Sequence, residues 1–423
     1  MSTEQKICFD EAMSGQNLFI SGPGGVGKSF VVKHIIKEFK ARGHKFRIAA
    51  STGVAALNVG GSTIHSLLGT RLAGNIKEAK EYHGTGAMQK AQARLNFVKT
   101  LIIDEVSMLS GDYITMMDWW LQQVRSCPEA FGGVQIIFCG DFLQLPPVEK
   151  GDTAEYRFAI DSPSWERANL KTIDLQRSFR QDDAVFVNAL NRVRFGEYTK
   201  EIRKVFRPCV DRELEEPTHL VATNKEADQI NFDKLRAHPG EELYAKPNFS
   251  IFTKYPDGVK EKMVRDSLTD SPLCLKTGVP VLLLKNHREG MYVNGSRGVV
   301  KRLNQSGDGE IGSILVTLDT GEDVLVERVE WEQLDGDGRV LAIMTHFPVR
   351  LGWALTIHKS QGLTLDNVEI DLSRGFACGQ AYVALSRMRS LEGLSLTIPI
   401  DPSIVKAEPR LVEFYDKARV NEL

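Results

Sequence analysis

The segment GPGGVGKS, residues 22–29, constrains the fold of this chain more than any other stretch. It matches the pattern G-x-x-x-x-G-K-[ST] and lies between an apolar run typical of a strand (17–21) and a run with apolar residues at helical spacing (29–43). In that context glycines let backbone N–H groups wrap phosphates, Lys28 reaches the β- and γ-phosphates, and the Ser29 hydroxyl ligates Mg²⁺. The alternative is a loop that is merely flexible, but the flanking strand and helix favour a nucleotide site.

The first 150 residues alternate strand-like and helix-like runs. Four short apolar runs, each ending in small or polar residues, predict buried strands over 17–21, 46–52, 100–105 and 134–141. Alternating strands and helices indicate a parallel sheet that is covered on both faces. Ligands then gather at the carboxyl ends of the strands.

The rest of the chain predicts a second α/β unit and two insertions. Its expected strands are 218–224, 279–285, 368–373 and 394–400. Between 297 and about 350, strand-like runs alternate with Gly/Asp turns, which is typical of a small antiparallel β-barrel. The Gly-, Ala- and Lys-rich residues 66–98 break the rhythm of the first unit, and we expect a small inserted subdomain there.

Two further strand ends in the first unit carry polar residues suited to hydrolysis. In LIIDEVSM an apolar strand delivers Asp104 to the metal, and Glu105 can polarise a water as general base. Most Asp-Glu pairs are solvated surface charges, but this one follows an apolar strand and a phosphate loop. A kinase rarely needs the adjacent carboxylate, so the pair favours hydrolysis. In FCGDFLQLPPV, Asp141 and Gln144 can read the γ-phosphate or its attacking water, whereas the alternative is an ordinary turn stabilised by prolines.

Hydrolysis also needs positive charge on the γ-phosphate in the transition state. The first unit offers Lys28 but no obvious second cation. The candidates are the arginines Arg177, Arg180, Arg387 and Arg389. Most arginines are solvated surface residues, but the second unit has no phosphate loop of its own. An α/β unit with arginines and no such loop suggests a composite site that ATP closes and product release opens.

Composition sets the class of protein. The chain has 423 residues, a net charge of −2, and 42% hydrophobic and 26% charged residues, which predicts a soluble globular protein of two to four domains. The near-neutral charge argues against a protein that coats polyanions but allows a local basic groove. The six cysteines form no C-x-x-C pair, so we expect reduced thiols and neither a disulfide framework nor a zinc site. With no signal peptide and only strand-sized apolar runs, the prediction is an intracellular protein that makes no membrane contact.

A set of eight segments carries a family resemblance. In order they are GPGGVGKS, ASTGVAALNVGGSTIHS, LIIDEVSML, GDFLQLPPV, LQRSFRQ, YVNGSRGVV, TIHKSQGLTLDNVEIDLS and AYVALSRMRSLEGL. Together they resemble the petite-integration-frequency family of DNA helicases, the RecD-like 5'-to-3' branch of superfamily 1, from about residue 4 to residue 394. The resemblance implies an ATP-dependent helicase that unwinds duplexes, forks, RNA–DNA hybrids or G-quadruplexes. The missing long N-terminal extension suggests a bacterial or viral protein or the trimmed core of a nuclear or mitochondrial one.

The resemblance also implies a fold: α/β, with two RecA-like P-loop NTPase domains in tandem, each carrying a small insertion. The first insertion is a short helical or loop wedge subdomain, and the second is an SH3-like β-barrel. The expected boundaries are 1–65 and 95–170 for the first domain, 66–94 for the wedge, 171–298 and 346–423 for the second domain, and 299–345 for the barrel.

Carried over position by position, the family motifs assign the ATP site. Gln5 would read the adenine, Gln144 would sense the γ-phosphate, and Arg180 and Arg387 match the two arginine fingers, whereas Arg177 and Arg389 have no match. The expected nucleotide-binding residues are Gln5, Gly22, Pro23, Gly24, Gly25, Val26, Gly27, Lys28, Ser29, Asp104, Gln144, Arg180, Gly362 and Arg387. The expected catalytic residues are Lys28, Glu105, Gln144, Arg180 and Arg387, and the expected metal ligands are Ser29 and Asp104. The cofactors are ATP and Mg²⁺.

Single-stranded DNA is the expected partner, and its contacts are spread over the motifs. Small and hydroxyl residues after strands suit contacts with the phosphate and sugar, although each Ser or Thr also suits a helix N-cap. In TIHKSQG, Lys359 has no glycine cradle ahead of it, so we expect the first half to hold DNA and the end, at Gly362, to approach the nucleotide. The expected DNA-binding residues are Thr52, Gly53, Thr63, His65, Ser66, Lys285, Asn294, Thr356, His358 and Lys359.

Three other functions remain open from the sequence. A translocase that moves on single strands but unwinds poorly would carry the same motifs. A nucleotide-gated nucleic-acid-binding module would have lost Glu105, Gln144 or an arginine finger, and all are present. A small-molecule P-loop kinase explains the first 150 residues but not the second unit. We expect a monomer in the absence of DNA, with replication or repair proteins as further partners.

Overall fold

The computed structural model describes residues 1–52, 55–56, 59–70, 73–147, 155–181, 183–252, 258–287, 289–334, 339–373 and 377–420. The chain divides into two compact units. Unit 1 comprises Met1–Phe179, Leu334–Val340 and Ala407–Leu423, and unit 2 comprises Arg180–Gln333 and Leu341–Lys406.

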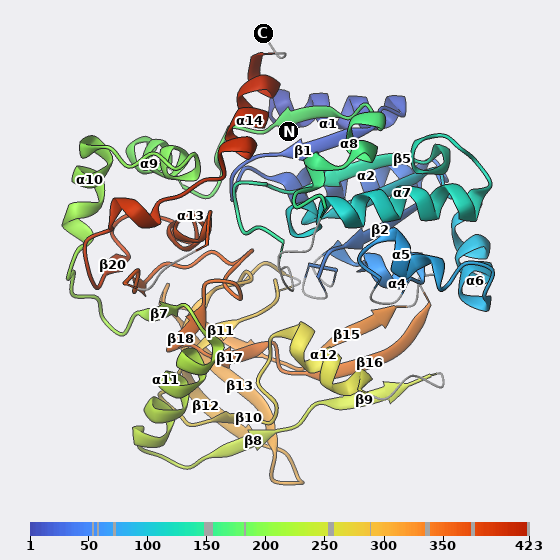
Figure 1. Ribbon diagram of the computed structural model, residues 1–423. Helices are drawn as coiled ribbons and strands as arrows, with labels where there is room; N and C mark the ends of the chain where they lie inside the picture. Colours follow the sequence, from blue (N-terminus) through green and yellow to red (C-terminus); the bar gives the residue numbers. More distant parts are fainter. Residues whose placement is uncertain are drawn as a thin grey trace. The chain divides into compact units, whose positions relative to one another are not determined.

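Unit 1 is built on a parallel sheet with strand order β3-β2-β4-β5-β1-β6. Figure 1 labels β1, β2 and β5 of this sheet. Its strands are β1 (Leu18–Ser21), β2 (Phe46–Ala50), β3 (Ser62–Thr63), β4 (Thr100–Asp104), β5 (Gln135–Cys139) and β6 (Lys171–Asp174). The four strands predicted from apolar runs are confirmed as β1, β2, β4 and β5, and so is the parallel sheet. Since β1 lies between β5 and β6, and β4 next to β5, the ends of β1, β4 and β5 meet at one edge of the sheet.

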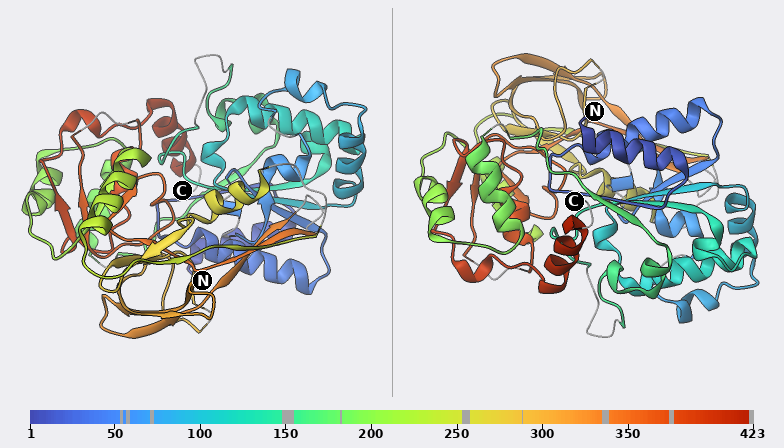
Figure 2. Two further views of the ribbon diagram at one scale, coloured as in Figure 1. Left: turned by 90° about the horizontal axis from the view of Figure 1, so that it is seen from below. Right: turned by 90° about the horizontal axis from the view of Figure 1, so that it is seen from above.

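Helices cover both faces of this sheet, as predicted. Alternate residues of a strand point to opposite faces: Leu18 and Ile20 of β1 join the core formed with α1 and α2, whereas Phe19 contacts Trp165 of α8 at 5.3 Å between ring centroids. Figure 2 shows α1 and α2, in blue, and the teal helices on opposite sides of the strands. The helices of unit 1 are α1 (Thr3–Ser14), α2 (Lys28–Ala41), α4 (Ile64–Leu68), α5 (Ile76–Lys80), α6 (Gly86–Leu95), α7 (Gly111–Arg125), α8 (Pro163–Arg167) and α14 (Pro409–Val420), with 3₁₀ turns η1 (Val106–Met108), η2 (Ala130–Gly133) and η3 (Ala159–Asp161).

The described part of segment 66–98 contains the end of α4, then α5 and α6, with turns between them, and it packs along α7. The Trp120 indole N–H donates to the Leu68 carbonyl at 2.9 Å. The Arg125 guanidinium donates to the carbonyls of Asn96 and Val98, at 3.0 Å each. These bonds satisfy carbonyls at the ends of α4 and α6, and they fix the segment to α7.

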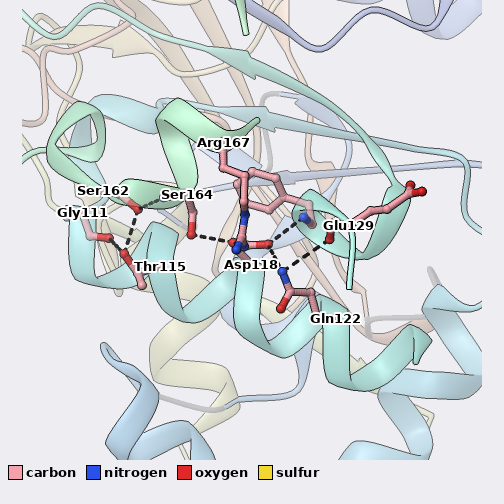
Figure 3. A network of polar contacts seen from close by, with 9 residues as sticks. Gly111, Thr115, Asp118, Gln122, Glu129, Ser162, Ser164 and Arg167 are labelled. Atoms are coloured by element: carbon pink, nitrogen blue, oxygen red, sulfur yellow. Dashed lines mark hydrogen bonds and ion pairs between the residues drawn. The ribbon is translucent and has the colours of Figure 1, made fainter. Parts of the chain in front are cut away.

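A buried carboxylate fastens α7 to the elements around it (Figure 3). Asp118 accepts hydrogen bonds from the Ser164 hydroxyl at 2.5 Å and from the Phe131 N–H at 2.7 Å, and it also pairs with Arg167. A buried charge is stable only when it is paired and hydrogen-bonded, and Asp118 has both kinds of partner. The network therefore joins α7 to α8 and η2 and supports the layer of helices on the second face of the sheet.

Unit 2 contains a second parallel sheet, with strand order β18-β7-β19-β20. Its strands are β7 (Thr218–Val221), β18 (Ala354–Thr356), β19 (Val368–Ile370) and β20 (Leu394–Leu396). The predicted strands in 218–224, 368–373 and 394–400 are confirmed. The helices of unit 2 are α9 (Ala184–Arg194), α10 (Lys200–Phe206), α11 (Asn224–Ala237), α12 (Val259–Ser267) and α13 (Gln380–Leu385), with 3₁₀ turns η4 (Arg207–Cys209) and η5 (Pro402–Ile404).

The expectation that 279–285 belongs to this parallel sheet is wrong. That run forms β11 (Pro280–Leu283), which pairs antiparallel with β12 and β17 in a five-stranded sheet of order β14-β13-β12-β11-β17. A fully buried apolar run looks alike in the two kinds of sheet, which explains the misassignment. The antiparallel strands are β8 (Leu243–Ala245), β9 (Asn248–Ile251), β10 (Leu273–Leu275), β11, β12 (Arg297–Gln305), β13 (Ile311–Leu318), β14 (Asp323–Val326), β15 (Val329–Leu334), β16 (Val340–His346) and β17 (Val349–Leu351).

The antiparallel sheet runs almost directly into the parallel one. β17 pairs with β11, and only Gly352 and Trp353 separate it from β18, which pairs with β7. A side chain at Gly352 would lie 3.1 Å from the backbone of Pro280, which is tighter than ordinary contact, so the close approach favours a glycine. The segment TIHKSQG therefore begins at the end of β18, a strand of the parallel sheet that closely follows β17 of the antiparallel sheet.

Candidate functional site

The phosphate loop lies between β1 and α2 and has the backbone that its glycines predict. Gly22, Gly25 and Gly27 have φ values of 139°, 87° and 84°, a region that L side chains rarely adopt. A Cβ at Gly22 would lie 2.5 Å from the Leu175 carbonyl oxygen, so no other residue fits there. The Lys28 ammonium donates to the carbonyls of Gly22 at 2.6 Å and Pro23 at 3.0 Å, which holds it over the loop where a phosphate would lie.

Gln5 supports this loop from α1. Its side chain is buried and completes a capping box with Ser2, and its amide Nε2 donates to the Val26 carbonyl at 3.2 Å. A side chain at Gly27 would come within 2.6 Å of that amide. The structure thus places Gln5 against the loop backbone, while adenine recognition stays a prediction.

Asp104 and Glu105 lie at the end of β4, as the sequence indicated. The Asp104 carboxylate accepts the Glu105 N–H at 2.9 Å. Burial raises the pKa of Asp104, and the hydrogen bond from the Glu105 backbone opposes that rise. Glu105 has a φ of 53°, which is strained for a residue with a side chain; such strain often accompanies functional sites.

The residues after β5 form a compact polar turn. Asp141 is 1% exposed, and its Oδ1 accepts the Leu143 N–H at 3.1 Å while its Oδ2 accepts the Gln144 side-chain amide at 3.3 Å. Asp141 therefore orients the amide of Gln144. The polar side chains predicted from three separate strand ends lie at one edge of the sheet, because β1, β4 and β5 are neighbours or next neighbours.

Unit 2 brings the two predicted arginine fingers together. The Arg180 guanidinium donates to the Ser386 carbonyl at 2.8 Å, and the Arg387 guanidinium, 1% exposed, donates to the Val383 carbonyl at 2.9 Å and the Ser386 hydroxyl at 2.8 Å. Burial, together with the positive charge of Arg387, lowers the pKa of Arg180 to about 9, so Arg180 remains cationic at neutral pH. Two cations held close together form a ready site for an anion.

The arginines without a family match have different surroundings. Arg389 is half-exposed and pairs with Asp366 at 3.4 Å. Arg177 is exposed and its guanidinium lies 5.3 Å from the centre of the Phe179 ring. Both environments are typical of surface arginines.

The predicted DNA residues of unit 1 follow β2 and β3. The Thr52 hydroxyl accepts the Ala55 N–H at 3.2 Å, whereas Thr63 stands at the N-cap of α4 without a side-chain capping bond. The His65 ring packs on Tyr113 at 4.8 Å, and the Ser66 carbonyl accepts from Arg94 at 2.9 Å. Thr63 thus has a hydroxyl that the helix start does not use. The predicted residue Gly53 lies outside the described residues.

The predicted DNA residues of unit 2 fall in two places. In TIHKSQG, Thr356 is 3% exposed and its hydroxyl accepts the Lys359 N–H at 3.2 Å, whereas His358 is exposed and Lys359 half-exposed. Burial lowers the pKa of both His358 and Lys359. Gly362 closes the loop with a φ of 83°.

The second place is the loop between β11 and β12. The Lys285 ammonium lies 4.5 Å from the centre of the Trp331 ring and donates to the Glu330 carbonyl at 2.5 Å. The Asn294 N–H donates to the Asn286 side chain at 2.7 Å, and the buried Asn294 Oδ1 has no hydrogen-bond partner among the described residues.

Known proteins with similar sequences supply the context for this geometry. Residues 1–207 match the model of the PIF1-like helicase family. The chain is 33% identical over 417 residues to an ATP-dependent DNA helicase Pif1 of Bdellovibrio bacteriovorus, covering 98% of this chain and 91% of that one. The chain belongs to the PIF1-like helicase family. The resemblance drawn from the eight motifs is thereby confirmed.

Solved structures of this family have the same fold. A Pif1 helicase from Bacteroides matches with a TM-score of 0.87 and 30% identity, covering 100% of this chain and 97% of that one. Bacteroides Pif1 in complex with ADP-AlF4 matches with a TM-score of 0.85 and 30% identity over 99% and 97%. The fold is accordingly α/β with two RecA-like domains, as predicted.

The chain is shorter than several of its relatives. It spans 55% of the length of a Trypanosoma brucei helicase PIF6, at 33% identity, and 65% of Danio rerio PIF1, at 35% identity, while the matches cover 98% and 100% of this chain. Among the described residues, no helix combines the length and the apolar character that crossing a membrane requires.

One contact at this site was not anticipated from the sequence. Tyr415, on α14 near the end of the chain, places its hydroxyl 2.6 Å from the Ser21 hydroxyl, beside the phosphate loop. No motif marked this tyrosine. A Phe-Tyr pair on an amphipathic helix would have indicated only a core position.

Proposed function

We propose that this chain is an ATP-dependent DNA helicase that moves 5'-to-3' on single-stranded DNA and unwinds duplexes and forks. The observation that carries the proposal is the convergence of the phosphate loop, the Asp104–Glu105 pair and the Asp141–Gln144 turn at the ends of neighbouring parallel strands. Membership of the family supports it, as do related structures described as bound to single-stranded DNA and at forked double-stranded DNA. RNA–DNA hybrids and G-quadruplexes are proposed as further substrates.

In the proposed reaction the residues of unit 1 bind and position ATP. The loop N–H groups and Lys28 hold the phosphates, Glu105 takes a proton from the attacking water, and Gln144 orients that water against the γ-phosphate. The Lys28 ammonium leaves its two loop carbonyls for the more negative phosphates. A relative's complex with ADP-AlF4 supports nucleotide use.

The residues present fit Mg²⁺ bound to nucleotide rather than to a protein cage. The described residues contain no group of three His, Cys, Asp or Glu side chains that could hold a metal. Mg²⁺ in phosphoryl-transfer sites commonly has one or two protein oxygen ligands, with phosphates and waters as the rest. The Ser29 hydroxyl and the Asp104 carboxylate would be those ligands, and the ion would neutralise phosphate charge.

Arg180 and Arg387 would supply the remaining positive charge. Held together in unit 2, they repel each other, and an anionic γ-phosphate would relieve that repulsion. We propose that both act as arginine fingers toward ATP held by the phosphate loop, and that Gly362 approaches the same nucleotide. Bound ATP then favours one arrangement of the units over another, which couples hydrolysis to movement.

DNA would be held through its backbone. Thr63, His358 and Lys359 offer a hydroxyl, an exposed ring and a cation that suit sugar and phosphate contacts. Thr52, His65 and Thr356 would act mainly by shaping the turns that present them. The other proposed contacts are Gly53, Ser66, Lys285 and Asn294.

The proposed domains keep the expected boundaries, 1–65 and 95–170, 66–94, 171–298 and 346–423, and 299–345, except that residues 407–423 belong to unit 1. We infer an SH3-like barrel for 299–345 from its consecutive antiparallel strands and the buried core they enclose. We infer that 66–94 contains the wedge, because its helices are fixed to α7 and could resist force from a duplex.

ATP hydrolysis with and without single-stranded DNA tests the proposal. Hydrolysis should be slow with protein alone and rise by at least tenfold with single-stranded DNA, with both rates lost when Mg²⁺ is chelated. A rate of ATP hydrolysis that is unchanged by DNA would favour the P-loop kinase alternative. DNA binding without hydrolysis would favour the nucleotide-gated binding module.

A further inference from the structure

Tyr415 occupies an unusual place for a residue so late in the chain. It lies on α14, whose residues belong to unit 1 although the preceding residues belong to unit 2. Its side chain is 0% exposed. The chain therefore leaves unit 2 and returns to the core of unit 1 to bury one phenol there.

The hydroxyl of Tyr415 contacts two loops of the candidate site. Its Oη lies 2.6 Å from the Ser21 Oγ, and Ser21 directly precedes the first glycine of the phosphate loop. The Phe142 N–H donates to the same Oη at 3.1 Å, and the Tyr415 O–H donates to Asp141 Oδ1 at 3.4 Å. One oxygen atom thus joins the end of β1 to the turn that follows β5.

The directions of these hydrogen bonds follow from how many a phenol hydroxyl can donate and accept. A tyrosine hydroxyl donates one hydrogen bond and accepts two. The Phe142 N–H can only donate, and the Asp141 carboxylate, when ionised, can only accept. Ser21 then donates to Tyr415, and the Tyr415 O–H donates to the Asp141 carboxylate.

That carboxylate is the link to the nucleotide site. Asp141 accepts from Tyr415 through Oδ1 and from the Gln144 amide through Oδ2, at 3.3 Å. Both Asp141 and Gln144 are buried, so hydrogen bonds to the charged oxygen are stronger than they would be in water. Fixing one oxygen of the carboxylate fixes the direction in which the other holds the amide.

We propose that Tyr415 is a positioning residue for ATP hydrolysis, which holds Asp141 and thereby sets the orientation of the Gln144 amide. This rests on the proposed role of Gln144 at the γ-phosphate. Packing of α14 is supplied separately by Phe414, whose ring lies 6.1 Å from Phe19 and 6.0 Å from Phe142. The ring next to Tyr415 in sequence therefore offers a matched control for loss of packing.

The first test compares Tyr415→Phe with Phe414→Leu in single-stranded-DNA-stimulated ATP hydrolysis. Tyr415→Phe removes only the hydroxyl and should lower kcat by about tenfold, with KM for ATP within about twofold. Phe414→Leu should lower the melting temperature but leave kcat within about twofold. Unchanged kcat in Tyr415→Phe, or equal losses in the two variants, would overturn the proposal.

A double-mutant cycle with Gln144→Ala separates positioning from a merely structural role. If Tyr415 acts through Gln144, adding Tyr415→Phe to Gln144→Ala should change kcat by less than about twofold. Ser21→Ala disturbs the same network and should lower kcat less than Tyr415→Phe, and its effect should also vanish in the Gln144→Ala background. This variant keeps the test open if Tyr415→Phe fails to fold.

Independent losses that multiply would contradict the proposal. If Gln144→Ala alone leaves kcat unchanged, the role of Gln144 fails and the positioning role fails with it. The proposed helicase activity is tested separately, by DNA-stimulated hydrolysis in the unmodified chain. That hydrolysis can be present even if the variants show no positioning role for Tyr415.

Discussion

Two loops in this molecule place a Lys-Ser pair after a strand of a parallel sheet, and they differ in almost every other respect. After β1, glycines with positive φ precede Lys28, and Ser29 is exposed at the start of a 14-residue helix. After β18, Thr356 caps the turn that precedes Lys359, and Ser360 is fully buried with its hydroxyl on the Ile357 carbonyl at 2.8 Å. The hydroxyl-bearing residue is thus exposed in the first loop and buried in the second. The same dipeptide therefore has different surroundings because of the residues before it, and we expect the two loops to bind different ligands.

The largest contrast is expected between the two lysines. Lys28→Ala should lower DNA-stimulated kcat by on the order of a thousandfold while leaving DNA affinity within about twofold. Lys359→Ala should leave kcat at saturating DNA within about threefold, weaken DNA binding severalfold, and reduce the salt dependence of binding by about one phosphate contact. Hydrolysis assays and fluorescence anisotropy at several salt concentrations measure both. If the two variants lost the same property, the contrast between the loops would be wrong.

The arginines give the next contrast. Arg387→Ala should lower kcat by about a hundredfold or more, because it removes the guanidinium proposed to offset the negative charge of the γ-phosphate in the transition state. Arg389→Ala, beside it in sequence but half-exposed and paired with Asp366, should stay within about twofold. Circular dichroism checks that the Arg387 variant is folded, since that side chain is buried. Similar losses in both variants would mean that the segment acts through general charge rather than through one positioned guanidinium.

The serines should separate metal use from stability. Ser29→Ala should raise the Mg²⁺ concentration needed for half-maximal hydrolysis by about tenfold, because it removes a hard oxygen ligand. Ser360→Ala should leave that concentration unchanged and lower the free energy of unfolding by about 1 kcal/mol, because it removes a buried hydrogen bond. Mg²⁺ titrations and urea unfolding measure the two quantities. An unchanged Mg²⁺ requirement in Ser29→Ala would argue against its role as a ligand.

The smallest expected effect belongs to Thr356. Its hydroxyl holds the Lys359 N–H, so Thr356→Ala should loosen the turn and weaken DNA affinity about threefold, with the KM for ATP unchanged. Thr356→Ser, which keeps the hydroxyl, is the control and should bind DNA like the unmodified chain. Equal losses of DNA and ATP affinity would mean that the loop is structural throughout.

Local patterns predicted where the residues of the candidate nucleotide site lie in the sheet of unit 1. Strand, glycine loop and helix are adjacent in sequence around residues 22–29, and Asp104 and Asp141 each follow an apolar run directly. The neighbours of a strand are not local, which is why 279–285 was placed in the wrong sheet. Tyr415 could not be predicted, because Ser21 and Asp141, its partners, are close to it only after folding.

Unwinding of a fork with a single 5' tail, compared with one carrying a single 3' tail, tests the central claim most directly. The chain should separate the 5'-tailed substrate in the presence of ATP and Mg²⁺ and leave the 3'-tailed one largely intact. After Lys28→Ala it should separate neither substrate. ATP-dependent preference for the 3' tail would contradict the proposed polarity. Robust DNA-stimulated hydrolysis without unwinding of either substrate would show a translocase and contradict the helicase activity.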